Sequence, residues 1–300
     1  MAVTPSPIRF TCNICGDANE YRGVELPRED PTCASCQSNV RLRGIVHSLS
    51  IELFGVSLPL MQFPRVKSLR GVGLSDSSTY AGRLLEKFDY RNTFVDRAPL
   101  LDITQPAETD LAAYDFIVAG DVLEHVPPPV ERSFENLFRM LKPSGVLVMT
   151  APYSLEASTL EHYPELHQLG FGRVGGKTVL LNRTPDGQFH VFENPVFHGG
   201  IGSTLEMREF SGKDLEDRLA AAGFRDIRIV SEDFAPFGIV WSYAWSLPIV
   251  ARKGPATLDA GARRDVMEEW RDLNQKFHGE MKRLNRSFWF RTIRKLGLLR

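Results

Sequence analysis

The chain has 300 residues, of which 43% are hydrophobic, so it is long enough for one large domain or for a domain and a small module. Its formal net charge is −1, which gives no overall attraction to nucleic acid or to a membrane surface. The chain has no run of about 18 apolar residues, and residues 1–9 lack the basic-then-apolar pattern of a signal peptide. The sequence therefore predicts a cytoplasmic protein without a membrane-spanning helix.

The four cysteines of the chain form two C-x2-C pairs near its start. Cys12 and Cys15 are followed, after 17 residues, by Cys33 and Cys36. This spacing is typical of zinc sites, and four thiolates satisfy a tetrahedral zinc ion with no position left for substrate. We therefore predict a structural zinc ribbon over residues 1–38, in which the metal replaces a core that so short a segment cannot build.

Two disulfides or a redox pair are the alternatives for these cysteines. Disulfides do not suit a cytoplasmic chain, and a redox pair needs a thioredoxin-like βαβ unit that the segment lacks. The segment also contains several acidic residues near Arg41 and Arg43, so it is not a basic patch and we expect no nucleic-acid partner.

Residues 39–62 predict a linker helix, because apolar residues recur near one face of it, and the main domain follows over residues 63–254. Residues 65–73 predict the first strand of this domain and residues 79–88 a helix. Gly71 and Gly73 lie at the turn between them, where glycine lets a backbone approach a ligand closely. A plain strand-to-helix turn is the alternative.

Residues 91–96 predict the second strand and residues 100–104 the third. Asp96 ends the second strand, about 20 residues beyond the glycines, where an acidic side chain can accept hydrogen bonds from ribose hydroxyls. A solvated turn aspartate is the alternative for this residue.

The most informative stretch runs from Tyr114 to Pro127. Residues 116–119 predict a buried strand, and Glu124 and His125 follow at its carboxyl end, where open α/β sheets bind their ligands. An amphipathic helix over about 130–141, a Lys-Pro-Ser-Gly turn and a second apolar strand over 145–152 complete a βαβ unit.

These residues resemble strands four and five of class I S-adenosylmethionine-dependent methyltransferases, and most closely the branch whose fourth strand ends in Leu-Glu-His-Val, here residues 123–126. The resemblance covers roughly residues 63–252. It implies an α/β fold with a Rossmann-like, seven-stranded sheet, preceded here by the zinc ribbon and followed by a helical tail. It also implies S-adenosylmethionine as the cofactor, in addition to the structural zinc.

The resemblance assigns roles around the cofactor. The glycine turn would hold its amino-acid part, although the family's third glycine is absent and the acidic residue follows the glycines. The carboxylate of Asp102 would accept from the adenine amine, Ile103 would pack on the ring, and the end of strand four would contact the methionine and methyl groups. The implied cofactor contacts, with Asp96, are Gly71, Gly73, Asp76, Asp96, Asp102, Ile103, Gly120 and Asp121.

Residues 153–205 have no place in a minimal methyltransferase sheet, and we predict that this insertion forms a substrate lid. Histidine titrates near neutral pH, so the candidate catalytic bases are His125, His190 and His198. A purely structural role is the alternative for His125. The strings Phe-His-Gly-Gly at 197–200 and Leu-Glu-Met-Arg at 205–208 resemble bacterial methyltransferases that carry a four-cysteine module, often beside glycosyltransferase, capsule or secondary-metabolite pathways.

Residues 211–222 predict a helix, and residues 227–230 and 247–251 the last two strands. The tail, 255–300, predicts an amphipathic helix from the spacing of Val266, Trp270, Leu273, Phe277, Met281, Leu284 and Phe288. We favour packing of this stripe on the body or on a second subunit, which would give a homodimer. A membrane surface or an acidic partner is the alternative, because residues 282–300 contain seven basic residues and no acidic one.

Together these features predict methyl transfer from S-adenosylmethionine to oxygen or nitrogen of a small-molecule or carbohydrate acceptor in a biosynthetic pathway, with carbon as a third acceptor type. One alternative is a cofactor-binding module without turnover, because the third glycine is missing. The other is an NAD-dependent enzyme, which is disfavoured because the chain lacks Gly-x-Gly-x-x-Gly at the first turn.

Overall fold

The computed structural model describes residues 7–198, 204–256 and 260–286, and its centre is a six-stranded sheet in the order β15-β16-β6-β5-β3-β4. Four strands are parallel and the edge pair is antiparallel, so the predicted Rossmann-like α/β class with a mostly parallel sheet is confirmed. The strands are β3 (Val66–Leu74), β4 (Phe88–Thr93), β5 (Tyr114–Gly120), β6 (Leu141–Thr150), β15 (Arg225–Ile229) and β16 (Ile249–Arg252).

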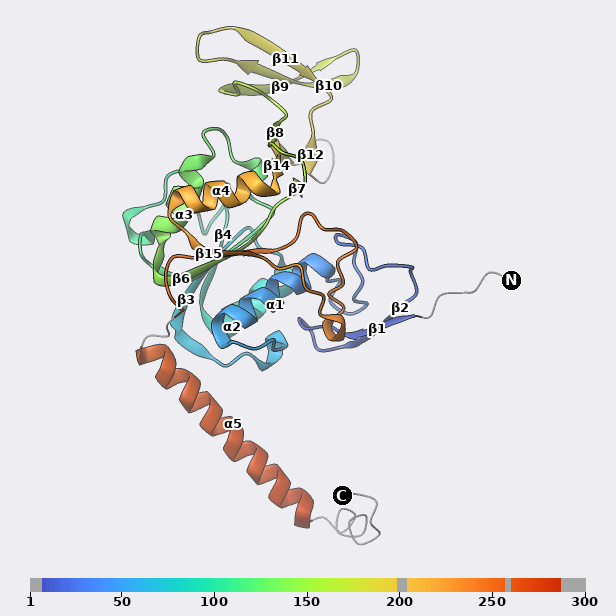
Figure 1. Cartoon of the computed structure of the whole chain (residues 1–300), viewed down its shortest axis with the longest axis vertical. Coiled ribbons are helices and arrows are strands. Elements are labelled where there is room, and N and C mark those ends of the chain that lie inside the picture. Colours follow the sequence, from blue (N-terminus) through green and yellow to red (C-terminus); the bar gives the residue numbers. More distant parts are fainter. Residues whose placement is uncertain (1–6, 199–203, 257–259, 287–300) are drawn as a thin grey trace, which may run out of the picture.

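Helices cover both faces of this sheet, which is why its central strands are apolar on both sides. On β5, Phe116 and Val118 belong to one core, whereas Ile117 and Ala119 belong to another on the opposite face. Figure 1 shows α1 and α2 on one side of the sheet and α3 and α4 on the other. Their bounds are α1 Val40–Phe54, α2 Ser78–Lys87, α3 Glu131–Met140 and α4 Gly212–Ala222.

The N-terminal segment packs on the same face as α1. It starts with the hairpin of β1 (Ile8–Thr11) and β2 (Ala18–Tyr21), and its Cys12 and Leu26 share one core cluster with α1 and the sheet. The Asn39 side chain caps α1 by accepting a hydrogen bond from the Leu42 amide. The helix predicted as a linker thus lies between the cysteine module and the sheet.

The insertion after β6 forms a layer of short strands around a three-stranded antiparallel meander, β9-β10-β11, which projects beyond the sheet in Figure 1. Five buried residues, among them Tyr163, Leu180 and Met207, give it a core of its own. Its strands are β7 (Tyr153–Ser154), β8 (Leu160–Glu161), β9 (Gln168–Val174), β10 (Lys177–Arg183), β11 (Phe189–Glu193), β12 (Phe197–His198), β13 (Thr204–Leu205) and β14 (Arg208–Ser211).

Short 3-10 turns connect several of these elements. The side chain of Ser211 caps α4 by accepting from the Asp214 amide, and Gly223 ends the helix in the left-handed conformation, as the sequence predicts for a helix over 211–222. The 3-10 turns are η1 (Leu60–Gln62), η2 (Glu108–Asp110), η3 (Leu123–His125) and η4 (Ala235–Phe237).

The predicted third strand, residues 100–104, does not form. Only one bridge pairs Leu100 with Phe94, and the Asp102 carboxylate accepts hydrogen bonds from the Thr104 amide at 2.8 Å and hydroxyl at 2.7 Å. These local bonds fold the chain into a turn instead of an extended ladder. Among the described residues the sheet therefore has six strands, and the prediction of a seventh is not confirmed.

The C-terminal helix α5 (Ala260–Arg286) touches the body near its start and then runs away from it, as Figure 1 shows. Asp265 accepts hydrogen bonds from the Ser68 amide and hydroxyl, and Val266 packs against the core. Dimerisation through the predicted stripe stays a prediction, and Phe288 lies outside the described residues. Within the described ranges no helix is both long enough and apolar enough to cross a membrane.

Candidate functional site

A cavity of about 500 Å³ opens at the carboxyl ends of β3, β4 and β5, where a doubly wound sheet binds its ligands. The turn after each of these strands contributes to it, and two residues of the segment predicted as a lid also line it: His198 and Thr204. The lining residues are Leu74, Ser75, Phe94, Val95, Asp96, Arg97, Leu101, Asp102, Ile103, Thr104, Asp121, Val122, His125, Val126, Pro127, His198 and Thr204.

Two strand ends in this cavity have an unusual backbone. Ser75 follows β3 with a φ of 57°, and Asp121 follows β5 with a φ of 53°. Left-handed conformations of residues other than glycine cost roughly 1–3 kcal/mol and concentrate at functional sites. The chain accepts this cost at the two turns where its backbone borders the cavity.

Asp121 is held in the cavity by the N-terminal segment. Its carboxylate lies 3.1 Å from Arg41 Nε and 3.4 Å from Arg28 Nη2, and it accepts a hydrogen bond from the Thr150 hydroxyl at 2.7 Å. Burial acts to raise the pKa of Asp121, but the two guanidinium groups outweigh it and the pKa lies below its usual value. Asp121 is therefore ionised at neutral pH.

The opposite end of the cavity carries exposed carboxylates beside apolar side chains. The Asp96 side chain is 69% exposed, and Asp102 is exposed next to buried Ile103. Arg97 stacks over the Phe94 ring at 3.8 Å from the ring centre. This end therefore offers acceptors for ligand hydroxyl and amine groups beside an apolar surface.

The predicted glycine turn does not line the cavity. A side chain on Gly71 would overlap the Phe116 ring, and one on Gly73 would overlap the Tyr90 hydroxyl and the Asp76 carboxylate. These two glycines therefore serve close packing inside the sheet.

Asp76 and Gly120 also lie behind the cavity wall. The Tyr90 hydroxyl donates to the buried Asp76 carboxylate, and burial raises the pKa of Asp76 to about 7. The open side of Gly120 faces Ile45 and Arg41 of α1.

The strand-four motif is locked in place by the Leu-Glu-Met-Arg string of β13 and β14. Arg208 is fully buried and holds both ends of η3, so the orientation of Glu124 and His125 depends on it. The bonds run from Met207 N to Glu124 O at 2.8 Å and from Arg208 Nη1 to Leu123 O at 3.1 Å and Val126 O at 2.7 Å.

Two of the three candidate histidines meet at the cavity. The His125 and His198 rings pack edge to face with centres 5.4 Å apart, and both line the cavity. Burial lowers the pKa of His125, so its ring is neutral at neutral pH. His190 lies instead on β11 beside Phe192 and does not line the cavity.

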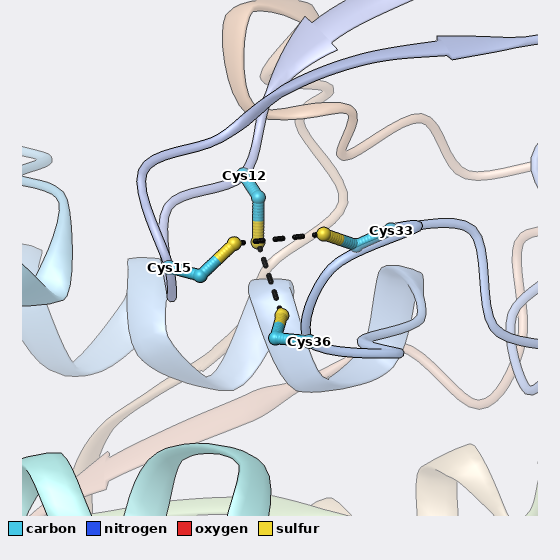
Figure 2. Close-up of side chains that lie close together, drawn as sticks. All are labelled: Cys12, Cys15, Cys33 and Cys36. Carbon is cyan, nitrogen blue, oxygen red and sulfur yellow. Dashed lines mark hydrogen bonds between the residues drawn. The ribbon is translucent and has the colours of Figure 1, made fainter.

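The four cysteines converge on one point, as Figure 2 shows, and their sulfur atoms all lie within 4.8 Å of one another. The Cys12–Cys36 sulfurs are 3.7 Å apart and the Cys15–Cys33 sulfurs 3.6 Å, far beyond a disulfide bond of about 2.05 Å. A tetrahedral zinc ion with bonds of about 2.3 Å separates its sulfur ligands by about 3.8 Å. The geometry fits zinc and excludes the two-disulfide alternative for this arrangement.

A family model described as a methyltransferase domain matches residues 67–229, more than half of the chain. The chain belongs to this methyltransferase family. The prediction of an S-adenosylmethionine-dependent methyltransferase is confirmed at this level. A comparison with curated proteins gives no match.

Solved structures similar to this methyltransferase share little sequence with it. A Burkholderia thailandensis 1,6-didemethyltoxoflavin-N1-methyltransferase with bound 1,6-didemethyltoxoflavin and S-adenosylhomocysteine is 14% identical, with 70% of this chain and 78% of that chain covered and a TM-score of 0.37. The sugar N-methyltransferase KedS8 from Streptoalloteichus sp. is 13% identical, with 70% and 85% covered and a TM-score of 0.40. At such low sequence identities, the acceptors of these enzymes do not indicate the acceptor of this methyltransferase.

Sequence reasoning missed the arginines that shape the methyltransferase site. Arg28 and Asp121 are 93 positions apart, and no local pattern links them. The motif at 205–208, which contains Arg208, stood out in the sequence, but the sequence did not show its contact with residues 123–126. Such pairings depend on the folded chain.

Proposed function

We propose that this methyltransferase transfers the methyl group of S-adenosylmethionine to oxygen or nitrogen of a small-molecule or sugar acceptor. The observation that supports it is the cavity, which is lined by Asp96 and Asp102 from the segment after β4 and by Asp121 and His125 from the segment after β5. These residues were proposed from the sequence as cofactor contacts or as a base, and they line one space.

The acceptor groups of the cavity suit the parts of the cofactor. The exposed Asp96 and Asp102 carboxylates would accept from the ribose hydroxyls and the adenine amine, with Ile103 against the ring. The ionised Asp121 would face the positively charged methionine end. S-adenosylmethionine, when bound, supplies a methyl group on a positively charged sulfur.

The chain then has to position the acceptor, exclude water and receive a proton. Positioning alone is worth roughly 7–11 kcal/mol of a bimolecular barrier. His125 and His198 stand where the lid meets the cavity, and a neutral His125 ring can accept the proton of a hydroxyl or ammonium acceptor. Two of the three predicted bases, His125 and His198, thus keep this role, and His190 has no part in it.

We also propose that Cys12, Cys15, Cys33 and Cys36 hold a structural zinc ion. Its support is the convergence of four sulfurs at the separations that a tetrahedral ion requires. With four thiolates the ion has no open position, so it stabilises the module and takes no part in the chemistry.

Calorimetric titration with S-adenosylmethionine and S-adenosylhomocysteine tests the main proposal, with NAD as the control ligand. We expect micromolar binding of both sulfur compounds and no binding of NAD. Binding without methylation of sugars, small phenols or amines in a subsequent screen would favour the cofactor-binding module. Binding of neither sulfur compound would contradict the proposed function, and binding of NAD alone would favour the dehydrogenase alternative.

A further inference from the structure

Neither oxygen of the Glu124 carboxylate has a hydrogen-bond partner among the described residues, although its side chain is 0% exposed. A buried acceptor without a hydrogen bond destabilises the folded protein, and more so when it is charged. Natural proteins carry few such groups, and an ion is one of the explanations for them. Glu124 lies in η3, four residues after the end of β5, next to His125, which lines the cavity.

His125 is oriented toward this carboxylate by the lid. Its Nδ1 donates a hydrogen bond to the Leu205 carbonyl at 2.8 Å, because a carbonyl oxygen can only accept. In the neutral ring this fixes the proton on Nδ1 and leaves the Nε2 lone pair free. Nε2 lies 3.6 Å from Glu124 Oε1. A backbone carbonyl on the other ring nitrogen is the usual support of a metal-binding histidine.

His198 of β12 completes the group. One donor atom each from Glu124, His125 and His198 lies within 4.8 Å of the others, and both histidines line the cavity. Two imidazoles and a carboxylate form the ligand set of open sites for divalent transition metals such as zinc or iron. With three protein ligands, such an ion keeps positions free for water or substrate.

We propose that Glu124, His125 and His198 bind a divalent transition-metal ion at the edge of the cofactor cavity. This site is separate from the four-cysteine site, since its ligands come from the strand-four turn and the lid. The Glu206 carboxylate lies near enough to act electrostatically on Glu124 and His125, and its negative charge favours a cation there.

The ion would define the acceptor class, an inference that rests on the proposed methyl transfer. A hydroxyl group, or two adjacent hydroxyls of a sugar or catechol-like ring, is a suitable ligand for the free positions of the ion. Coordination lowers the pKa of an oxygen ligand, so the acceptor can lose its proton to water near neutral pH without a free imidazole base. Its oxygen would then form a bond to the methyl carbon as the bond from that carbon to the cofactor sulfur breaks, which leaves S-adenosylhomocysteine. His125 would then act as a metal ligand and the acceptor would be an oxygen.

Cobalt(II) titration of the full-length protein in its zinc-loaded form tests the site. Protein treated with mild chelator keeps its cysteine-bound zinc, and added Co²⁺ is followed by calorimetry and visible absorption. We expect one further equivalent to bind, with a weak visible band and without the intense near-ultraviolet band that sulfur ligands give. His198→Ala, which alters an exposed ligand, should weaken this binding by at least about tenfold, as should Glu124→Gln. His167→Ala, another exposed lid histidine, is the matched control and should bind like the unmodified protein.

A protein that takes up no second equivalent, or a His198→Ala variant that binds Co²⁺ unchanged, would overturn the metal site. S-adenosylhomocysteine is titrated into the same samples so that the two proposals can fail separately. Cofactor binding without metal binding removes the ion and leaves the methyltransferase function intact. Metal binding without cofactor binding supports the site and contradicts the proposed function.

Discussion

Four aspartates near one sheet edge differ in state because their surroundings differ. Asp96 and Asp102 are exposed at the cavity, whereas Asp121 is buried and ionised against two arginines. Asp76 is buried beside a tyrosine hydroxyl, and burial raises its pKa to about 7. The same residue type is therefore an exposed cavity residue, a buried ion-pair partner and a packed, protonatable group.

Asp102→Ala should weaken binding of S-adenosylhomocysteine by roughly tenfold or more, the scale of one lost hydrogen bond to a charged group. Calorimetric titration measures this loss. Because the Asp102 carboxylate also holds the turn at Thr104, Thr104→Ala is the control that removes the local hydroxyl bond but keeps the carboxylate. Equal losses in both variants, or no loss in Asp102→Ala, would remove the adenine assignment.

Asp76 should make folding stability fall as pH rises from about 4 to about 7. In the unfolded chain its carboxyl ionises near its ordinary pKa of 3.8, whereas in the folded protein it keeps its proton up to a pKa of about 7. Below the lower pKa, Asp76 is protonated in both the folded and the unfolded chain, so no folding stability is lost. Above the upper value the loss is complete.

Asp76→Asn cannot ionise, so the variant should lack this part of the pH dependence. Between pH 5 and 8 the stability of the unmodified protein should fall by about 2–3 kcal/mol more than that of the variant. Urea unfolding at a series of pH values gives the two curves. Parallel curves would show that Asp76 is already ionised in the folded protein.

At the scale of elements, the sequence predicts what local patterns determine. The helices at 78–87, 131–140 and 212–222 lie within a residue or two of their predicted positions, because capping residues and apolar periodicity mark their ends. The second strand is shifted, since β4 starts at Phe88, directly after α2, where Phe88 and Tyr90 pack in the core. The predicted third strand is replaced by the turn at Asp102, because local hydrogen bonds there compete with the hydrogen bonds of a β-ladder. The pattern of apolar residues in the sequence does not reveal this competition.

The residues of the site, too, include some that local patterns predict and some that only the folded chain determines. Residues placed by strand ends, such as Asp96 and His125, could be expected at the cavity because ligands bind at the carboxyl ends of parallel strands. The glycines were assigned to the cofactor by resemblance, and that role stays a prediction; in the folded sheet their open sides are filled by Phe116 and Tyr90. Which neighbour fills the space above a glycine is a property of the folded sheet.

Gly73→Ala should therefore destabilise β3 by about 1–3 kcal/mol, the cost of overpacking a filled core. A methyl group there would overlap the Tyr90 hydroxyl and the Asp76 carboxylate. Gly82→Ala on the exposed side of α2 is the matched control, because nothing lies within 4 Å of its open side. In a helix that change should stabilise by about 0.5–1 kcal/mol. Thermal unfolding compares the two, and equal midpoints would contradict the packing role of Gly73.

At the scale of the whole molecule, the cysteine module and the methyltransferase sheet share one hydrophobic core. Cys12, Cys33 and Leu26 share a core cluster with α1 and with β5 and β6 of the sheet. Arg28 from the module and Arg41 from α1 extend from this shared core to Asp121 at the cavity. Whether the cysteine module is folded therefore affects the charge and position of the Asp121 carboxylate, which we assign to the cofactor.

Arg41→Met should lower the affinity for S-adenosylhomocysteine by roughly tenfold, because the buried Asp121 carboxylate loses a charged partner. Zinc content, measured by elemental analysis, should stay at one ion per chain. Arg22→Ala is the matched control, since Arg22 belongs to the same module but is 85% exposed and pairs with the surface residue Glu20. If the two variants bind the ligand equally well, the ion pair has no part in cofactor binding.

Removal of zinc should reach the cofactor site through the same contacts. The sulfurs of the four cysteines would repel or disperse without the ion, and a module of this size has little core to hold it. We expect zinc to leave only with a strong chelator or a denaturant, and its loss to lower the melting temperature and abolish S-adenosylhomocysteine binding together. Restoring zinc should restore both properties. A metal-free protein that stays folded and binds the ligand would show that the shared core, rather than the ion, positions Arg28 and Arg41 against Asp121.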